Sequence, residues 1–143
     1  LDIVVVNDGS VDQTAALARE NGAVVLDLLF NLGIGEAVQA GFRYAYEEGY
    51  DFAVRCDGDG QHSPSDITRL LKALRENDVD LVVGSRFLGE QVYSNTLVRH
   101  VGIFCLSWFL SLICRKRTTD PTSGFQALNR PLLYFFSRTY PKD

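Results

Sequence analysis

The sequence predicts an α/β fold with a mostly parallel sheet flanked by helices. Short apolar runs rich in β-branched residues alternate with stretches in which apolar residues recur at helical spacing. The first run, residues 3–6, is apolar at every position, as expected of a strand covered on both faces. The 143 residues suffice for one core, so we expect a single domain over residues 1–143. The chain starts within a strand and has no Met, which indicates a fragment truncated at both ends.

The elements follow from local signals along the chain. The predicted strands cover residues 3–6, 23–28, 52–56 and 80–84. The predicted helices cover residues 12–21 and 36–48, and a third begins at residue 64. Gly22 and Gly49 suit the position after the last turn of the first two helices. Ser63 before Pro64, with Asp66 in the first turn, is a strong start for the third.

Composition and charge exclude several classes of protein. The chain is 46% hydrophobic and 22% charged, which is typical of a globular domain rather than a disordered or fibrous one. A net charge of -4 argues against nucleic acid as the main partner, because binding a phosphate backbone needs a basic face. The three cysteines are odd in number and lack metal-like spacing, which favours buried thiols in a reducing compartment.

An apolar segment near the C-terminal end has two interpretations. Residues 101–114 contain no charged residue, and basic residues flank them, so we expect a hydrophobic helix with a basic end within residues 95–117. Fourteen residues are too few to span a bilayer, which needs about 20. The segment is either a core helix or a helix at a membrane interface. In the second case, Arg115-Lys116-Arg117 would attract anionic lipid.

Polar motifs follow three of the predicted strands. They are residues 8–10, 57–61 and 84–86, and the carboxyl ends of parallel strands share one edge of a sheet, where ligands bind. Asp57 and Asp59 are separated by one residue, glycines lie on either side of Asp59, and Gln61 offers a further oxygen. Such ligands suit Mg²⁺ or Mn²⁺, which usually keep positions open for substrate phosphates. His62 either adds a ligand or packs before the next helix.

Four further candidates each have a structural alternative. Asp8 contacts a nucleotide, helps to organise the metal site, or is a turn residue that caps the next helix. Arg86 either binds a diphosphate or forms a surface ion pair. Gly33 lies in the glycine-rich loop 31–35, whose amides either approach a phosphate or sugar or allow tight helix packing. Asp120, before Pro121, either acts as a general base or orients an acceptor, or it caps a turn.

Taken together, these motifs resemble family 2 glycosyltransferases of the GT-A fold. The likeness is strongest to the polyprenyl-phosphate branch, which is similar to dolichol-phosphate mannose synthase. It extends from about residue 3 to residue 130. The chain departs from the family pattern by lacking its first strand and by having Ile34 where Lys is frequent. The matching segments are Val5–Thr14, Asn31–Gly35, Asp57–Pro64, Val83–Phe87 and Asp120–Phe125.

The resemblance implies a nucleotide-diphosphate sugar donor, with UDP and GDP both open. It implies that Asp8 contacts the nucleotide and that Asp120 lies near the acceptor. The other implied site residues are Asp57, Asp59 and Gln61 around a divalent metal, and Arg86 and Arg99 at phosphates. Of these residues, Asp120 and Asp59 are expected to carry the chemistry.

These features predict an inverting glycosyltransferase that moves a hexose to a polyprenyl phosphate at the cytoplasmic face of a membrane. One alternative is a family 2 enzyme that acts on a glycan or protein hydroxyl. Another is a non-catalytic module that binds nucleotide or docks on a membrane. Because the first strand of the family is absent, we expect this segment alone to bind donor weakly or to be inactive.

Overall fold

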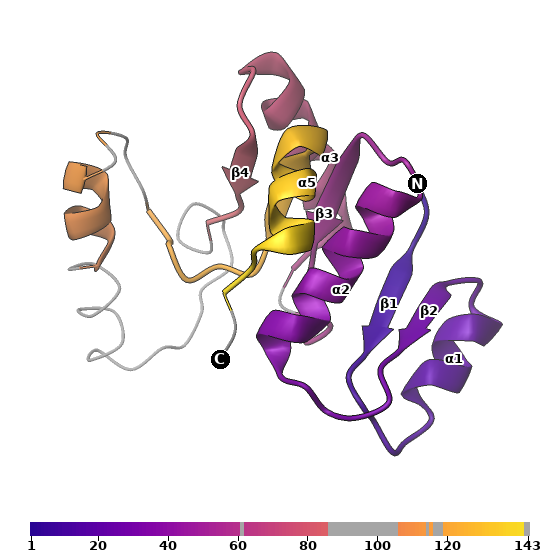
Figure 1. Cartoon of the computed structure of the whole chain (residues 1–143). Coiled ribbons are helices and arrows are strands. Elements are labelled where there is room, and N and C mark those ends of the chain that lie inside the picture. Colours follow the sequence, from indigo (N-terminus) through magenta and orange to yellow (C-terminus); the bar gives the residue numbers. More distant parts are fainter. Residues whose placement is uncertain (61, 86–105, 114, 116–118, 142–143) are drawn as a thin grey trace. The chain divides into compact units, whose positions relative to one another are not determined.

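A computed structural model describes residues 1–60, 62–85, 106–113, 115 and 119–141 (Figure 1). Helices and strands alternate along most of the described chain, as the sequence predicts. The chain divides into two compact units. The first comprises Leu1–Ala53 and Leu128–Asp143, and the second comprises Val54–Ala127.

The first unit contains a small parallel sheet. Strand β1 (Val4–Asn7) pairs with β2 (Val24–Asp27) in the register that places Val4 beside Val24. Helix α1 (Thr14–Glu20) connects the two strands, as a parallel pair requires (Figure 1). Gln13 is at the N-cap position, and the carboxylate of the preceding Asp12 accepts a hydrogen bond of 2.9 Å from the N–H of Thr14, the first residue of the helix.

Two helices enclose the core of the first unit. Helix α2 (Ile34–Glu47) and helix α5 (Arg130–Arg138) pack side by side (Figure 1). Phe42 lies over Phe136 with ring centroids 5.8 Å apart, within the range of favourable aromatic pairs. Burial of these apolar side chains is the main stabilising term for the unit. The buried cluster consists of Phe42, Ala45, Leu128 and Leu133.

The remaining strands form a second sheet with the order β3-β5-β4. They are β3 (Phe52–Arg55), β5 (Gln126–Asn129) and β4 (Leu81–Val83). In the second unit, helix α3 (Pro64–Glu76) precedes β4 and buries Leu70 and Leu74. Pro64 in its first turn confirms the predicted helix start.

The structure confirms the predicted α/β alternation and adds two elements. The strands and helices predicted up to residue 84 are all present, with ends shifted by a few residues. Strand β5 and helix α5 were not predicted. The described strands form two sheets, whereas one sheet was expected.

The apolar segment is helical over residues 106–113, and the rest of 95–117 apart from Arg115 lies outside the described residues. Trp108, Phe109, Leu112 and Ile113 are each more than half exposed, whereas Ser107 is buried. The large apolar side chains of this helix therefore do not form a core in the described structure. None of the helices in the described ranges is both long and apolar enough to cross a membrane.

A polar cluster joins the carboxyl ends of β1 and β2. The side-chain amide of the buried Asn7 donates a hydrogen bond of 2.8 Å to Asp27, which also pairs with Arg19. The Asn7 hydrogen bond, and then Arg19, hold the pKa of the Asp27 carboxyl below its usual value of 3.8.

The lowered pKa predicts how acid affects stability. A carboxyl with a lowered pKa in the folded state contributes stability above its unfolded pKa, and that stability is lost as the pH falls through the folded pKa. We therefore expect Asp27→Asn to lower the free energy of unfolding at neutral pH, and expect the difference from wild type to shrink as the pH falls below the usual carboxyl pKa of 3.8. Urea denaturation across this range measures the difference. A constant difference across the range would contradict the proposed linkage.

Candidate functional site

Asp8 forms two hydrogen bonds to the glycine-rich loop, residues 31–35, of the first unit. One carboxylate oxygen accepts a hydrogen bond of 2.7 Å from the Leu32 N–H, and the other accepts one of 3.0 Å from the Gly33 N–H. These amides lie at the start of α2, where the helix dipole favours an anion. The Asp8 carboxylate occupies that place. For Asp8, the sequence indicated a nucleotide contact, a role at the metal site or a cap of the next helix, but not these two hydrogen bonds. Nucleotide binding by Asp8 and Gly33 stays a prediction.

A close approach of backbones explains the glycine that follows Asp8. Gly9 has φ 73°, and a Cβ at this position would lie 2.7 Å from the Asn31 backbone nitrogen. Only a residue without a side chain fits both the backbone conformation and the contact. The Asp8–Gly9 turn and the 31–33 loop therefore form one rigid substructure.

Gly22 provides a matched control for this contact, because it also has positive φ, 81°, but an added Cβ would meet nothing within 4 Å. We expect Gly22→Ala to lower the free energy of unfolding by about 1 kcal/mol through backbone strain alone. Gly9→Ala carries the same strain plus the clash, so we expect a further loss of about 1–3 kcal/mol. Urea denaturation of both variants measures the difference. Equal losses would show that the loop yields to the methyl group.

The acidic loop, residues 57–60, begins two residues after β3 ends and belongs to the second unit. The Asp57 side chain is 38% exposed, and one of its oxygens lies 3.1 Å from the Arg55 guanidinium. Asp59 is exposed. Cys56 is exposed, whereas a buried thiol was expected. Partial desolvation, and then the negative charges of Asp57 and Asp59, raise the pKa of its thiol. The charges of both carboxylates therefore influence the Cys56 thiol.

The 120–125 turn lies against the acidic loop within the same unit. The Asp120 carboxyl is buried, with the residue only 2% exposed, and it accepts a hydrogen bond of 3.0 Å from the Thr122 hydroxyl. A Cβ on Gly124 would overlap the Asp57 carboxylate and would lie 2.8 Å from its Cγ. The absence of a side chain at Gly124 therefore leaves the space that the Asp57 carboxylate occupies.

The acidic loop is better suited to a cation that a substrate also coordinates than to a cation coordinated by protein side chains alone. Within residues 1–60, 62–85, 106–113, 115 and 119–141, no group of three or more His, Cys, Asp and Glu side chains could hold a metal. Asp57 and Asp59 supply hard oxygen donors near the surface. Mg²⁺ is commonly held by one or two carboxylates together with substrate phosphates and water. The donor set thus fits Mg²⁺ or Mn²⁺ bound with a diphosphate.

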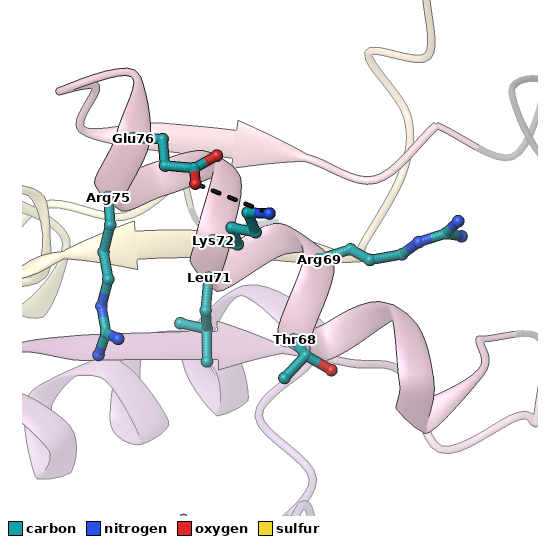
Figure 2. Close-up of a pocket in the computed structure, with 6 residues that line it drawn as sticks. All are labelled: Thr68, Arg69, Leu71, Lys72, Arg75 and Glu76. Atoms are coloured by element: carbon teal, nitrogen blue, oxygen red, sulfur yellow. Dashed lines mark ion pairs between the residues drawn. The ribbon is translucent and has the colours of Figure 1, made fainter.

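Helix α3 carries a surface hollow that none of these motif residues lines (Figure 2). Its lining residues are Thr68, Arg69, Leu71, Lys72, Arg75 and Glu76. Arg69 pairs with Asp66 at 3.1 Å, and Lys72 lies 3.7 Å from Glu76. One helix supplies the whole lining, and carboxylates already pair with two of the basic side chains, Arg69 and Lys72. The hollow is therefore not the candidate functional site.

Some predicted site residues cannot be placed. Gln61, Arg86 and Arg99 lie outside the described residues. Among the described candidates, the structure brings the acidic loop together with the turn that contains Asp120, whereas Asp8 belongs to the other unit. Sequence reasoning missed Arg55, although its position two residues before Asp57 is the spacing at which side chains of an extended chain share a face.

Comparisons with known proteins agree with these features. A family model described as glycosyl transferase family 2 matches residues 1–133. A UDP-N-acetylglucosamine–dolichyl-phosphate N-acetylglucosaminyltransferase of Methanococcus voltae is 31% identical over 95% of this chain and 61% of its own length. An undecaprenyl-phosphate mannosyltransferase of Micrococcus luteus is 36% identical over 88% of this chain and 54% of its own length. The chain thus spans little more than half of these relatives.

A solved structure shows the same fold. The crystal structure of glucosyl-3-phosphoglycerate synthase from Mycobacterium tuberculosis, in complex with phosphoglyceric acid, matches 92% of this chain with a TM-score of 0.65 at 24% identity. The match covers 46% of that protein. The described chain is therefore an α/β structure of the GT-A glycosyltransferase class. Within that class, the chain belongs to glycosyl transferase family 2.

Proposed function

We propose that the full-length protein transfers a hexose, with inversion, from a UDP- or GDP-sugar to a polyprenyl phosphate. The observation that carries the proposal is the contact of the acidic loop with the 120–125 turn in one compact unit. It brings the residues expected to bind the donor diphosphate close to the turn expected to serve the acceptor. The names of the two relatives, which specify dolichyl phosphate and undecaprenyl phosphate, support this acceptor class.

Asp57 and Asp59 are the residues that would hold Mg²⁺ or Mn²⁺, with Gln61 as a further ligand. When bound, the ion would offset the negative charge that develops on the leaving diphosphate. Arg55 lies 3.1 Å from Asp57 and partly balances its charge. Gly124 keeps room for the Asp57 carboxylate. Arg86 and Arg99 would bind phosphates of the donor or acceptor.

Asp120 would position the acceptor. A phosphate acceptor is already anionic near neutral pH, so it needs little deprotonation. A sugar or protein hydroxyl is neutral and needs a base to remove its proton as the new bond forms. The acceptor class therefore determines how strongly the reaction depends on the Asp120 carboxylate.

The helix at residues 106–113 would bring the protein to the cytoplasmic face of a membrane. Its exposed Trp108, Phe109, Leu112 and Ile113 could enter the lipid interface. The basic sequence Arg115-Lys116-Arg117 follows after Cys114 and would attract anionic lipid head groups. A polyprenyl phosphate carrier resides in the membrane, so this contact would deliver the acceptor.

Asp120→Asn separates the two acceptor classes. With polyprenyl phosphate, we expect kcat of the full-length protein to fall by less than about tenfold. With a hydroxyl acceptor, loss of a general base costs on the order of 100- to 10,000-fold. The measurement is transfer of radiolabelled hexose from UDP- or GDP-sugars into the organic phase with polyprenyl phosphate, and into the aqueous phase with oligosaccharides. Wild-type product only in the aqueous phase, with a large Asp120→Asn loss, would contradict the lipid-phosphate proposal.

A further inference from the structure

We propose that His62 is a positioning residue, which holds the acidic loop in its working place by stacking on Phe125. The inference rests on the proposed function, because it concerns the same loop. All the residues that carry it belong to the second unit.

The 120–125 turn is a fixed platform. The Ser123 hydroxyl donates a hydrogen bond of 2.6 Å to the Gly84 carbonyl, directly after β4. The Gly84 N–H in turn donates to the Phe125 carbonyl at 2.8 Å. Phe125 is only 4% exposed. Its ring occupies the space where Gly84 would carry a side chain. Main-chain and side-chain contacts therefore both tie the turn to the end of β4.

The His62 ring lies on this platform. Its centroid is 4.6 Å from that of Phe125, and the two ring planes differ by 17°, a stacked arrangement. A separation near 4.5 Å is at the close end of the range for favourable aromatic pairs. The side chain is thus held by stacking, which is a role for His62 that does not require metal ligation.

These contacts fix the acidic loop on both sides. Gly124 abuts Asp57 at its beginning, and Phe125 holds His62 two residues after its end. Between these points, a Cβ added at Gly58 or Gly60 would meet nothing within 4 Å. Close packing therefore does not restrain the chain at these two glycines, which give the backbone wide freedom. The contacts at the two ends of the loop therefore limit the backbone freedom that the glycines allow.

Ordering of the acidic loop in the ligand-free protein would strengthen ligand binding. A loop that is already in its bound conformation loses less conformational freedom when the ligand arrives. Loss of the stack can weaken binding by at most the free energy of the stack, which corresponds to about two- to tenfold in a dissociation constant. Without the stack, Asp57 and Asp59 would keep their carboxylates but would occupy the binding conformation for a smaller fraction of the time.

The test compares full-length wild type with His62→Ala and His62→Phe. The phenylalanine retains a ring for stacking but has no nitrogen to bind a metal. The first readout is hydrogen exchange over residues 57–60 in the ligand-free protein at millisecond to second times. The second is the dissociation constant for UDP or GDP with Mn²⁺. Thermal unfolding midpoints show that all three proteins are folded.

We expect His62→Ala to speed exchange in the acidic loop and to weaken nucleotide binding, each by about two- to tenfold, and His62→Phe to behave like wild type. Unchanged exchange in His62→Ala would overturn the proposal. A loss in His62→Phe as large as in His62→Ala would also overturn it, because the imidazole itself would then be required. If wild type binds neither nucleotide, the proposed function fails, while the exchange data still decide the role of His62.

Discussion

Asp59→Asn in the full-length protein is expected to lower kcat/KM for hexose transfer by on the order of 100-fold or more. Asp59 is exposed in the acidic loop and shares with Asp57 the region around Cys56, where the charges of both carboxylates act. Asparagine keeps the size of the side chain but removes the charge that would hold a divalent cation. The measurement is steady-state transfer at several Mn²⁺ concentrations.

Asp51→Asn is the matched control for charge. Asp51 is exposed immediately before β3 and lies outside the acidic loop, so its replacement removes the same charge without touching the site. We expect its kcat/KM to stay within about twofold of wild type. If Asp59→Asn behaved like Asp51→Asn, the acidic loop would not be the metal site.

Gly124→Ala is expected to have the second large effect on transfer. The new methyl group would overlap the Asp57 carboxylate, so the carboxylate or the turn must move. A displacement of about 1 Å in a reacting arrangement can cost on the order of 100-fold in rate. We expect a loss of that size in kcat/KM, and the thermal unfolding midpoint is measured beside it to show that the variant is folded.

Gly58→Ala isolates the effect of this contact. Gly58 lies in the same acidic loop, but an added Cβ would meet nothing within 4 Å. We expect near wild-type transfer from Gly58→Ala. Similar losses in the two variants would mean that flexibility of the loop, rather than room for Asp57, explains the glycine at position 124.

Most of the fold could be read from the sequence because its signals are local. Pro64 after Ser63 marked the start of α3, and it lies there. Strand β5 and helix α5 were missed, although Asn129 accepts a hydrogen bond from the Leu132 N–H as a helix cap. Burial of Leu128 and Leu133 depends on packing against α2, far away in the chain. A local pattern does not contain that contact.

The sequence predicted which types of residue form the candidate site, but not the contacts between them. The spacing of Asp57 and Asp59 indicated a cation site, and Pro121 beside Asp120 indicated a turn. The sequence does not show that Gly124 abuts Asp57, because about 65 residues separate them. The sequence left Asp8 open between a ligand contact and a helix cap, and it did not show that the Asp8 carboxylate accepts hydrogen bonds from the amides of Leu32 and Gly33. These are long-range contacts that only the folded chain reveals.

Titration calorimetry of UDP and GDP against the full-length protein, with and without Mn²⁺, tests most directly whether the acidic loop is a metal-diphosphate site. We expect one nucleotide to bind with Mn²⁺, and expect that binding to be lost when Mn²⁺ is omitted or when Asp59 is replaced by Asn. This result would also identify the base of the donor. Binding that is equally strong without Mn²⁺, or no binding of either nucleotide, would contradict the proposed site.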